Sequence, residues 1–240
     1  IFLDDEYCAI FVRSPHPHAK IKKIKTEAAL TVPGVVSILS AEDVENDGLR
    51  AMQPFITSNP NTKHPFNFIP QPLLAKKLVR YVGEPILLVL AKSMYAALDA
   101  VQLIEVDYDV LPFVLSAQEA LKEDSPLVAE ALGTNLCLNW RCSSNENIDV
   151  IFSQAKHVIE LNINNNRIVS NPMEPRGATA FWDQDTNKYT IYASSQNIHV
   201  MRDTVASMLN VDRNSVRFKA FDVGGGFGSK NFCYPEYALI

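Results

Sequence analysis

The segment at residues 223–230, VGGGFGSK, is the part of the chain whose residue types most clearly indicate a ligand site. Four of the nine glycines in the 240-residue chain fall within five consecutive positions of this segment. Glycine adopts positive φ values without steric cost, so such a loop can turn its N–H groups outward toward an anionic or metal-oxo ligand. The residue types alone leave a structural turn and a ligand cradle equally open.

Two nucleotide-binding motifs share features with this segment. A phosphate-binding P-loop has a Ser or Thr directly after its lysine, whereas here Ser229 precedes Lys230 and Asn231 follows it. A dinucleotide-binding fingerprint needs a third small residue where Ser229 stands and a helix that opens there, and the sequence meets this only in part. A phosphate-binding NTPase therefore stays a weaker alternative.

Two further polar segments precede the glycine loop, at residues 171–176 (NPMEPR) and 194–199 (SSQNIH). Gln196 lies between an expected strand and an expected helix. Its carboxamide is a neutral donor that keeps its protons at every working pH, which suits a hydrogen bond to an electronegative ligand atom.

Each of these residues also has a purely structural interpretation. Gln196 could cap the helix that begins near residue 198, and Phe227 could be a core aromatic. For Glu174 and Arg176 a structural ion pair is favoured, because exposed charge pairs need no functional explanation.

Composition excludes several classes of protein. Hydrophobic residues make up 47% of the chain and charged residues 20%, which is typical of a globular protein and argues against disorder. A net charge of -5 does not indicate the positively charged surface that is typical of nucleic-acid-binding proteins. No apolar run approaches the roughly 18 residues that span a bilayer, so we expect no transmembrane segment and a cytoplasmic location. The apolar stretch at residues 237–240 leads us to expect a piece of a longer protein.

The cysteines and histidines give little support for a metal site. No CxxC pair is present, so we expect reduced, buried thiols at Cys8, Cys137, Cys142 and Cys233. His16 and His18 form an HxH pair between prolines with no third ligand nearby, and we expect them to be solvated loop residues.

The pattern of apolar segments predicts an α+β chain in two parts. In the first part we expect strands at residues 8–12, 35–39, 78–82, 86–90 and 104–110, with helices at 28–32 and after Ser93. Five prolines predict a long surface loop at residues 53–72. Polar breaks place the domain boundary at about residue 145.

In the second part we expect a strand at residues 158–163 and a hairpin formed by residues 179–182 and 189–193. A helix at 199–209 should end at Asn210, and a strand at 216–221 should lead into the glycine loop.

The order of NPMEPR, the strand-end Gln196 and the glycine loop resembles the first molybdenum-cofactor half-domain of the large subunit of the xanthine dehydrogenase, aldehyde oxidase and aerobic carbon monoxide dehydrogenase family. Residues 11–19, 79–85 and 106–112 are similar to the a/b hammerhead domain that precedes it. The resemblance covers nearly the whole chain. It implies a hammerhead domain with linker over residues 1–145 and the first, truncated part of a molybdopterin-binding domain over residues 146–240.

The resemblance also implies a molybdenum–molybdopterin cofactor, in prokaryotic members often the cytosine dinucleotide form. Gln196 would donate its amide to a molybdenum oxo group, and the loop would line the cofactor through Gly225, Gly226, Phe227 and Gly228. No residue is expected to ligate the metal directly. The catalytic base of the family, a glutamate, is expected downstream of Ile240.

The implied activity is a molybdenum hydroxylase that oxidises an aldehyde, an N-heterocycle or CO with water as the oxygen source. The NPMEPR segment resembles that of family members with these substrates. Asn231 argues against a xanthine-like substrate, because purine-oxidising members carry a glutamate at that position. Electrons would leave through [2Fe–2S] and FAD subunits in an oligomer of heterotrimers. The alternative is a non-catalytic subunit-docking or assembly module.

Overall fold

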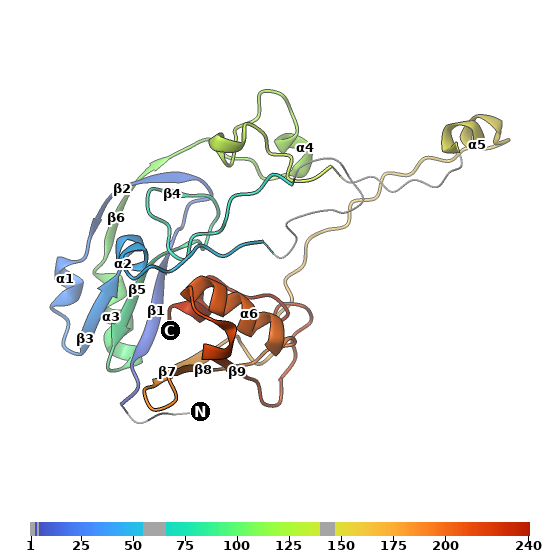
Figure 1. Cartoon of the computed structure of the whole chain (residues 1–240). Coiled ribbons are helices and arrows are strands. Elements are labelled where there is room, and N and C mark those ends of the chain that lie inside the picture. Colours follow the sequence, from blue (N-terminus) through green and yellow to red (C-terminus); the bar gives the residue numbers. More distant parts are fainter. Residues whose placement is uncertain (1–2, 4, 55–65, 140–146) are drawn as a thin grey trace.

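The computed structural model describes residues 3, 5–54, 66–139 and 147–240. It has an α+β architecture in two parts, drawn from blue to yellow-green and from yellow to red in Figure 1. The expected domain boundary at about residue 145 lies outside the described residues. So do residues 55–65 of the expected surface loop.

The first part contains two three-stranded antiparallel sheets. One consists of β1 (Cys8–Arg13), β5 (Pro85–Ala91) and β3 (Val35–Leu39), in that order. The other consists of β4 (Leu78–Val79), β2 (Ala19–Lys25) and β6 (Glu105–Val110), in that order. β5 is almost wholly buried because it is the central strand of its sheet, and this explains its continuous apolar sequence.

Helices of the first part are short, and three of those described begin at a serine cap: Ser40, Ser93 and Ser116. The helices are α1 (Glu27–Leu30), α2 (Ala41–Asn46), α3 (Met94–Gln102), α4 (Ala117–Ala120) and the 3-10 turn η1 (Glu130–Leu132). The expected cap of α3 is confirmed, since Ser93 Oγ accepts a hydrogen bond from the N–H of Ala96 at 3.2 Å. Small residues on α3, Ala97 and Ala100, let this helix pack closely on β5.

The second part is built on one mixed sheet. Its elements are α5 (Ile148–Gln154), β7 (Ala178–Asp183), β8 (Lys188–Ala193), α6 (Ile198–Leu209), η2 (Arg213–Ser215), β9 (Val216–Lys219) and η3 (Pro235–Ala238). β7 and β8 form the expected antiparallel hairpin, and β9 lies parallel to β8 on its other side. The helix between β8 and β9 ends as expected at Asn210, whose φ of 58° is the left-handed conformation of a helix terminator.

A shared core joins the two parts. One hydrophobic cluster combines Val44 and Leu73 of the first part with Ile191, Met201 and Val205 of the second. Across the same contact, Arg50 N–H donates to the carbonyl of Met208 at 2.7 Å. The two parts therefore fold against each other.

The expected strand at residues 158–163 is wrong, because residues 155–177 contain no regular secondary structure. Alternating apolar residues predicted a strand there, yet Ile159, Leu161 and Ile163 are between 75% and 91% exposed. A strand needs a neighbouring strand to pair its N–H and C=O groups, and no described segment pairs with this one. In Figure 1 the neighbouring helix α5 lies well away from the rest of the chain.

Candidate functional site

The strand order of the second sheet brings three loop segments to one edge. β8 and β9 are parallel, and the carboxyl ends of neighbouring parallel strands lie at the same edge of a sheet. Gln196 follows the end of β8 and the glycine loop follows the end of β9. β7 runs antiparallel to β8 with Ala178 opposite Ala193, so the segment with Glu174 enters at that edge too.

Gln196 contacts the glycine loop directly. Its Oε1 accepts a hydrogen bond from the backbone N–H of Gly228 at 3.0 Å. A Cβ at Gly226 would overlap this same oxygen, so only glycine lets the loop approach so closely. The Nε2 group of Gln196, on an exposed side chain, makes no hydrogen bond to any residue that the structure describes.

Two of the structural alternatives are wrong. Gln196 does not cap the following helix, because Asn197 does so through Oδ1, which accepts from the N–H of Val200 at 3.3 Å. Phe227 is not a core aromatic, since it is 74% exposed.

The glycine loop has an unusual backbone. Gly225 and Gly228 have φ values of 91° and 89°, and Phe227 has a φ of 48°, which is rare for a bulky residue. The carbonyl of Phe227 accepts a hydrogen bond from Ser170 Oγ at 2.8 Å. Within the described ranges, the N–H groups of Gly225, Gly226 and Phe227 donate to no protein acceptor. The loop therefore carries main-chain donors that are available to a ligand.

A carboxylate and a buried lysine stand beside the loop. Glu174 Oε2 accepts hydrogen bonds from Lys230 Nζ at 2.5 Å, Ser194 Oγ at 2.7 Å and the N–H of Gly224 at 2.7 Å. The hydrogen bond from Lys230, followed by those from Ser194 and Gly224, lowers the pKa of Glu174 to about 2. The expected pairing of Glu174 with Arg176 is wrong: the Arg176 guanidinium lies 3.5 Å from the centre of the Tyr234 ring.

The described histidines and cysteines lie in different environments. Among the described residues, no group of three or more His, Cys, Asp or Glu side chains could hold a metal ion. The expectation of solvated histidines is wrong for His18, which is buried with Nδ1 at 2.8 Å from the carbonyl of Pro112. Described cysteines are free thiols, and Cys137 is exposed, whereas burial raises the pKa of Cys233 to about 12. Cys142 lies outside the described residues.

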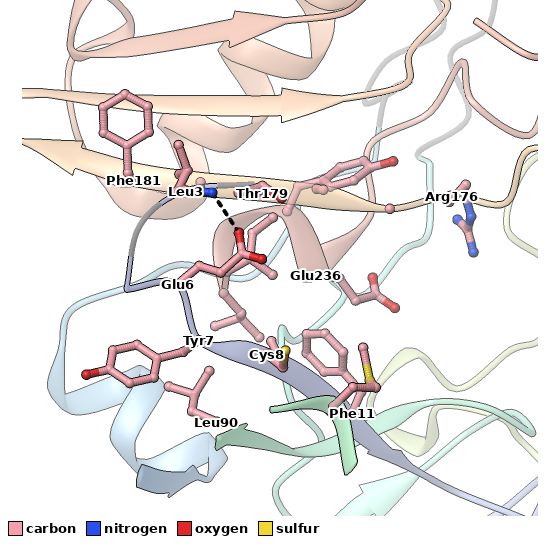
Figure 2. Close-up of a pocket in the computed structure, with 18 of the residues that line it drawn as sticks. Leu3, Glu6, Tyr7, Cys8, Phe11, Leu90, Arg176, Thr179, Phe181 and Glu236 are labelled. Carbon is pink, nitrogen blue, oxygen red and sulfur yellow. Dashed lines mark hydrogen bonds between the residues drawn. The ribbon is translucent and has the colours of Figure 1, made fainter. Parts of the chain in front are cut away.

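A cavity lies elsewhere, between the two parts of the chain (Figure 2). It has a volume of about 950 Å³, and the edge strands β1 and β7 and the turn η3 line it. Leu3, Tyr7, Phe11, Leu90 and Phe181 give it a largely apolar wall, and Arg176 and Glu236 also line it. Neither Gln196 nor the glycine loop contributes to it. This cavity is therefore separate from the candidate site, which is the sheet edge with the glycine loop.

No helix in the described ranges is both long enough and apolar enough to cross a membrane.

Two family models match consecutive parts of the chain. Residues 2–112 match the a/b hammerhead domain of aldehyde oxidase and xanthine dehydrogenase, and residues 128–240 match the molybdopterin cofactor-binding domain. These two domains in this order define the large, molybdopterin-binding type of subunit. The chain belongs to the xanthine dehydrogenase, aldehyde oxidase and carbon monoxide dehydrogenase family.

Individual relatives agree with this assignment. The chain is 33% identical over its full length to the nicotine 6-hydroxylase large subunit of Paenarthrobacter nicotinovorans. It is 32% identical over 94% of its length to the carbon monoxide dehydrogenase large chain of Hydrogenophaga pseudoflava. The chain spans 28% of the length of each of these two relatives. All of it superimposes on 30% of the quinoline 2-oxidoreductase chain from Pseudomonas putida 86, with a TM-score of 0.86 and 30% identity.

Proposed function

We propose that this chain supplies part of the cofactor site of a molybdenum hydroxylase, with Gln196, Gly225, Gly226, Phe227 and Gly228 as the residues that contact molybdenum–molybdopterin. The observation that carries the proposal is the hydrogen bond between Gln196 Oε1 and the N–H of Gly228. It holds a neutral carboxamide beside main-chain N–H groups that donate to no described residue.

The donor set at this edge fits an anionic group with electronegative acceptors. The available hydrogens are the main-chain N–H groups of Gly225, Gly226 and Phe227 and the Nε2 hydrogens of Gln196, none of which is lost by titration near neutral pH. The carboxylate of Glu174, which accepts from the N–H of Gly224, is already paired with Lys230. The absence of Cβ atoms at the glycines lets a ligand approach the backbone.

When bound, the cofactor supplies the two-electron oxidation chemistry of the family. The residues of this chain hold and orient it: Gln196 Nε2 donates toward its acceptor atoms, and the loop N–H groups stabilise its negative charge. A charge-assisted hydrogen bond of this kind contributes about 1.5–3 kcal/mol, so each donor matters for placement of the cofactor. We assign the role of general base to none of the residues that the structure describes at this edge, because the carboxylate of Glu174 is paired with Lys230.

The substrate we propose is an aldehyde, an aromatic N-heterocycle or CO. In support, relatives are named as a nicotine hydroxylase and a carbon monoxide dehydrogenase, and Asn231 stands directly after the loop lysine. We further propose the cytosine dinucleotide form of the cofactor, a cytoplasmic location, and electron transfer through [2Fe–2S] and FAD subunits in an oligomer of heterotrimers. The names "large subunit" and "large chain" of the relatives support partner subunits.

The test is made on the full-length subunit in its complex. Molybdenum and pterin contents and turnover with an artificial electron acceptor are measured for the wild type, Gln196→Ala and Gln118→Ala. Gln118 is an exposed glutamine on α4, far in sequence from the loop, and serves as the matched control. We expect Gln196→Ala to lower turnover roughly 10- to 100-fold, from the loss of one charge-assisted hydrogen bond, with folding unchanged.

Two outcomes would contradict the proposal. A wild-type complex without molybdenum or pterin would favour the alternative of a subunit-docking module. Wild-type turnover in Gln196→Ala with full cofactor content would remove Gln196 from the site.

A further inference from the structure

Lys230, the last residue of the glycine loop segment, is completely buried. Lysine is almost never fully buried unless its charge is paired, because an isolated ammonium loses its hydration on burial. Its Nζ lies 2.5 Å from Glu174 Oε2 and 3.3 Å from Ser194 Oγ. The proposed function makes no use of this buried charge.

A single carboxylate oxygen connects both ends of the loop. Glu174 Oε2 accepts from the N–H of Gly224, where the loop begins, and from Nζ of Lys230, where it ends. The fit is close, since a Cβ at Gly224 would lie only 2.7 Å from Glu174 Cβ. The loop is therefore closed at its base by one side chain from the segment before β7.

Lys230 also links this closure to Gln196. Its carbonyl accepts a hydrogen bond from the N–H of Gln196 at 2.9 Å, while Gln196 Oε1 accepts from Gly228 at 3.0 Å. Ser194, two residues before Gln196, donates its hydroxyl to Glu174. The same contacts thus fix the end of β8 and the start and end of the loop.

The backbone between the two ends needs such support. Phe227 has a positive φ, a conformation that costs energy for a bulky residue and persists only where the surroundings fix it. Two backbone bonds lie within the loop, from Ser229 N–H to the carbonyl of Gly226 at 2.8 Å and from Asn231 N–H to the carbonyl of Gly228 at 3.1 Å, and Ser170 Oγ donates to the carbonyl of Phe227. The closure at Gly224 and Lys230 adds a constraint at the base of the loop.

We propose that Glu174 and Lys230 are positioning residues: their ion pair, in which only the lysine is fully buried, closes the glycine loop and sets the loop N–H groups and the Gln196 carboxamide at the spacing that the cofactor requires. The inference rests on the proposed function, because it concerns the same site. Neither residue touches the cofactor in this role.

The experiment uses the full-length subunit, with and without cofactor, and the variants Lys230→Met, Glu174→Gln and the double variant. Lys76→Met, which removes a surface ion pair to Glu45 at 2.7 Å, is the control. In cofactor-free protein we measure hydrogen exchange of the peptide that covers residues 222–232. In cofactor-loaded protein we measure the molybdenum and pterin contents and the electron paramagnetic resonance signal of molybdenum(V).

We expect each single variant to speed exchange of the bonded amides in this peptide on the order of tenfold or more, because a charged hydrogen bond at the loop base is lost. The β7–β8 hairpin should keep its exchange rates. Cofactor content should fall in parallel, and the molybdenum(V) signal of what remains should change. The double variant, which leaves no unpaired buried charge, should recover part of the protection.

Unchanged loop exchange in Lys230→Met and Glu174→Gln would overturn the proposal, as would faster exchange with wild-type cofactor content and signal. If Lys230→Met fails to fold, the proposal is tested with Glu174→Gln and Ser194→Ala. The Ser194→Ala variant removes one hydrogen bond to the carboxylate of Glu174. A wild-type protein that binds no cofactor, but whose loop exchange responds to the variants, would remove the proposed function and leave only a structural closure.

Discussion

Gln196 and Gly228 are 32 residues apart in sequence, and the side-chain oxygen of the first accepts the backbone N–H of the second at 3.0 Å. This bond fixes the orientation of the carboxamide, because the oxygen must face the N–H donor and the NH₂ group must then face away from it. Gln196 thereby connects the end of β8 to the loop after β9 and keeps its own donor for a ligand.

Replacement of Gln196 by glutamate separates these two roles. A glutamate of the same shape still offers an oxygen to the N–H of Gly228, but its second oxygen is an acceptor and repels an anionic cofactor. We expect Gln196→Glu to keep the unfolding midpoint of the wild type and to lose turnover at least as strongly as Gln196→Ala.

Gln118→Glu, which makes the same change on the exposed surface of α4, should be indistinguishable from wild type in both measurements. Equal turnover of Gln196→Glu and wild type at full molybdenum content would show that Nε2 donates to nothing important.

Gly226 in the loop and Gly177 outside it should differ in their tolerance of a methyl group. A Cβ at Gly226 overlaps the side chain of Gln196. At Gly177, close to the same sheet edge, a Cβ meets no atom within 4 Å, and the backbone of Gly177 has no positive φ. Overpacking costs about 1–3 kcal/mol, and here Gln196 is the group that must move. We expect Gly226→Ala to lose cofactor while Gly177→Ala retains it, measured as pterin per subunit. Equal retention would mean that the close approach has no role.

A third prediction concerns the contact between the two parts of the chain. Arg13 donates to the carbonyl of Gly83 at 3.0 Å and to Glu236 Oε1 at 2.6 Å, and the other oxygen of Glu236 is buried and accepts no hydrogen bond from the residues that the structure describes. Removal of Arg13 leaves a partly buried carboxylate unpaired, so Arg13→Met should lower the free energy of unfolding by about 1–3 kcal/mol in urea titrations.

Lys25→Met provides the comparison, because its ion pair with Glu105 is exposed on both sides. Such exposed pairs contribute about 0–1 kcal/mol. If both variants are destabilised equally, the contact between Arg13 and Glu236 has no special part in holding the two parts together.

The meeting of Gln196 with the glycine loop could be predicted from the sequence, because a strand, a helix and a second strand in succession form a parallel pair whose carboxyl ends share an edge. The pair of Glu174 and Lys230 could not. These residues are 56 positions apart, and the choice of Lys230 over the nearby Arg176 depends on which side chain the core surrounds. The local sequence pattern around a lysine does not show whether its side chain is buried.

The strand expected at residues 158–163 failed for a related reason. Alternation of apolar and polar residues describes which face of a strand is suited to burial, but a strand exists only where a neighbour pairs with its backbone. That neighbour is a long-range property, and in the described residues none is present for this segment.

The last prediction concerns pH. The pKa of Glu174 is about 2 in the folded protein, against an ordinary value of 4.5, so the folded state binds this proton less tightly than the unfolded chain does. The stabilisation from this carboxylate is therefore fully present above about pH 4.5 and is lost as pH falls toward 2. Loop exchange, corrected for the intrinsic rate, should stay constant from pH 8 to pH 5 and rise below pH 4.5. Glu174→Gln should already exchange fast at pH 7 and show no such rise. A loop that loosens between pH 8 and pH 6 in the wild type would point to a different titrating group and would contradict the role assigned to Glu174.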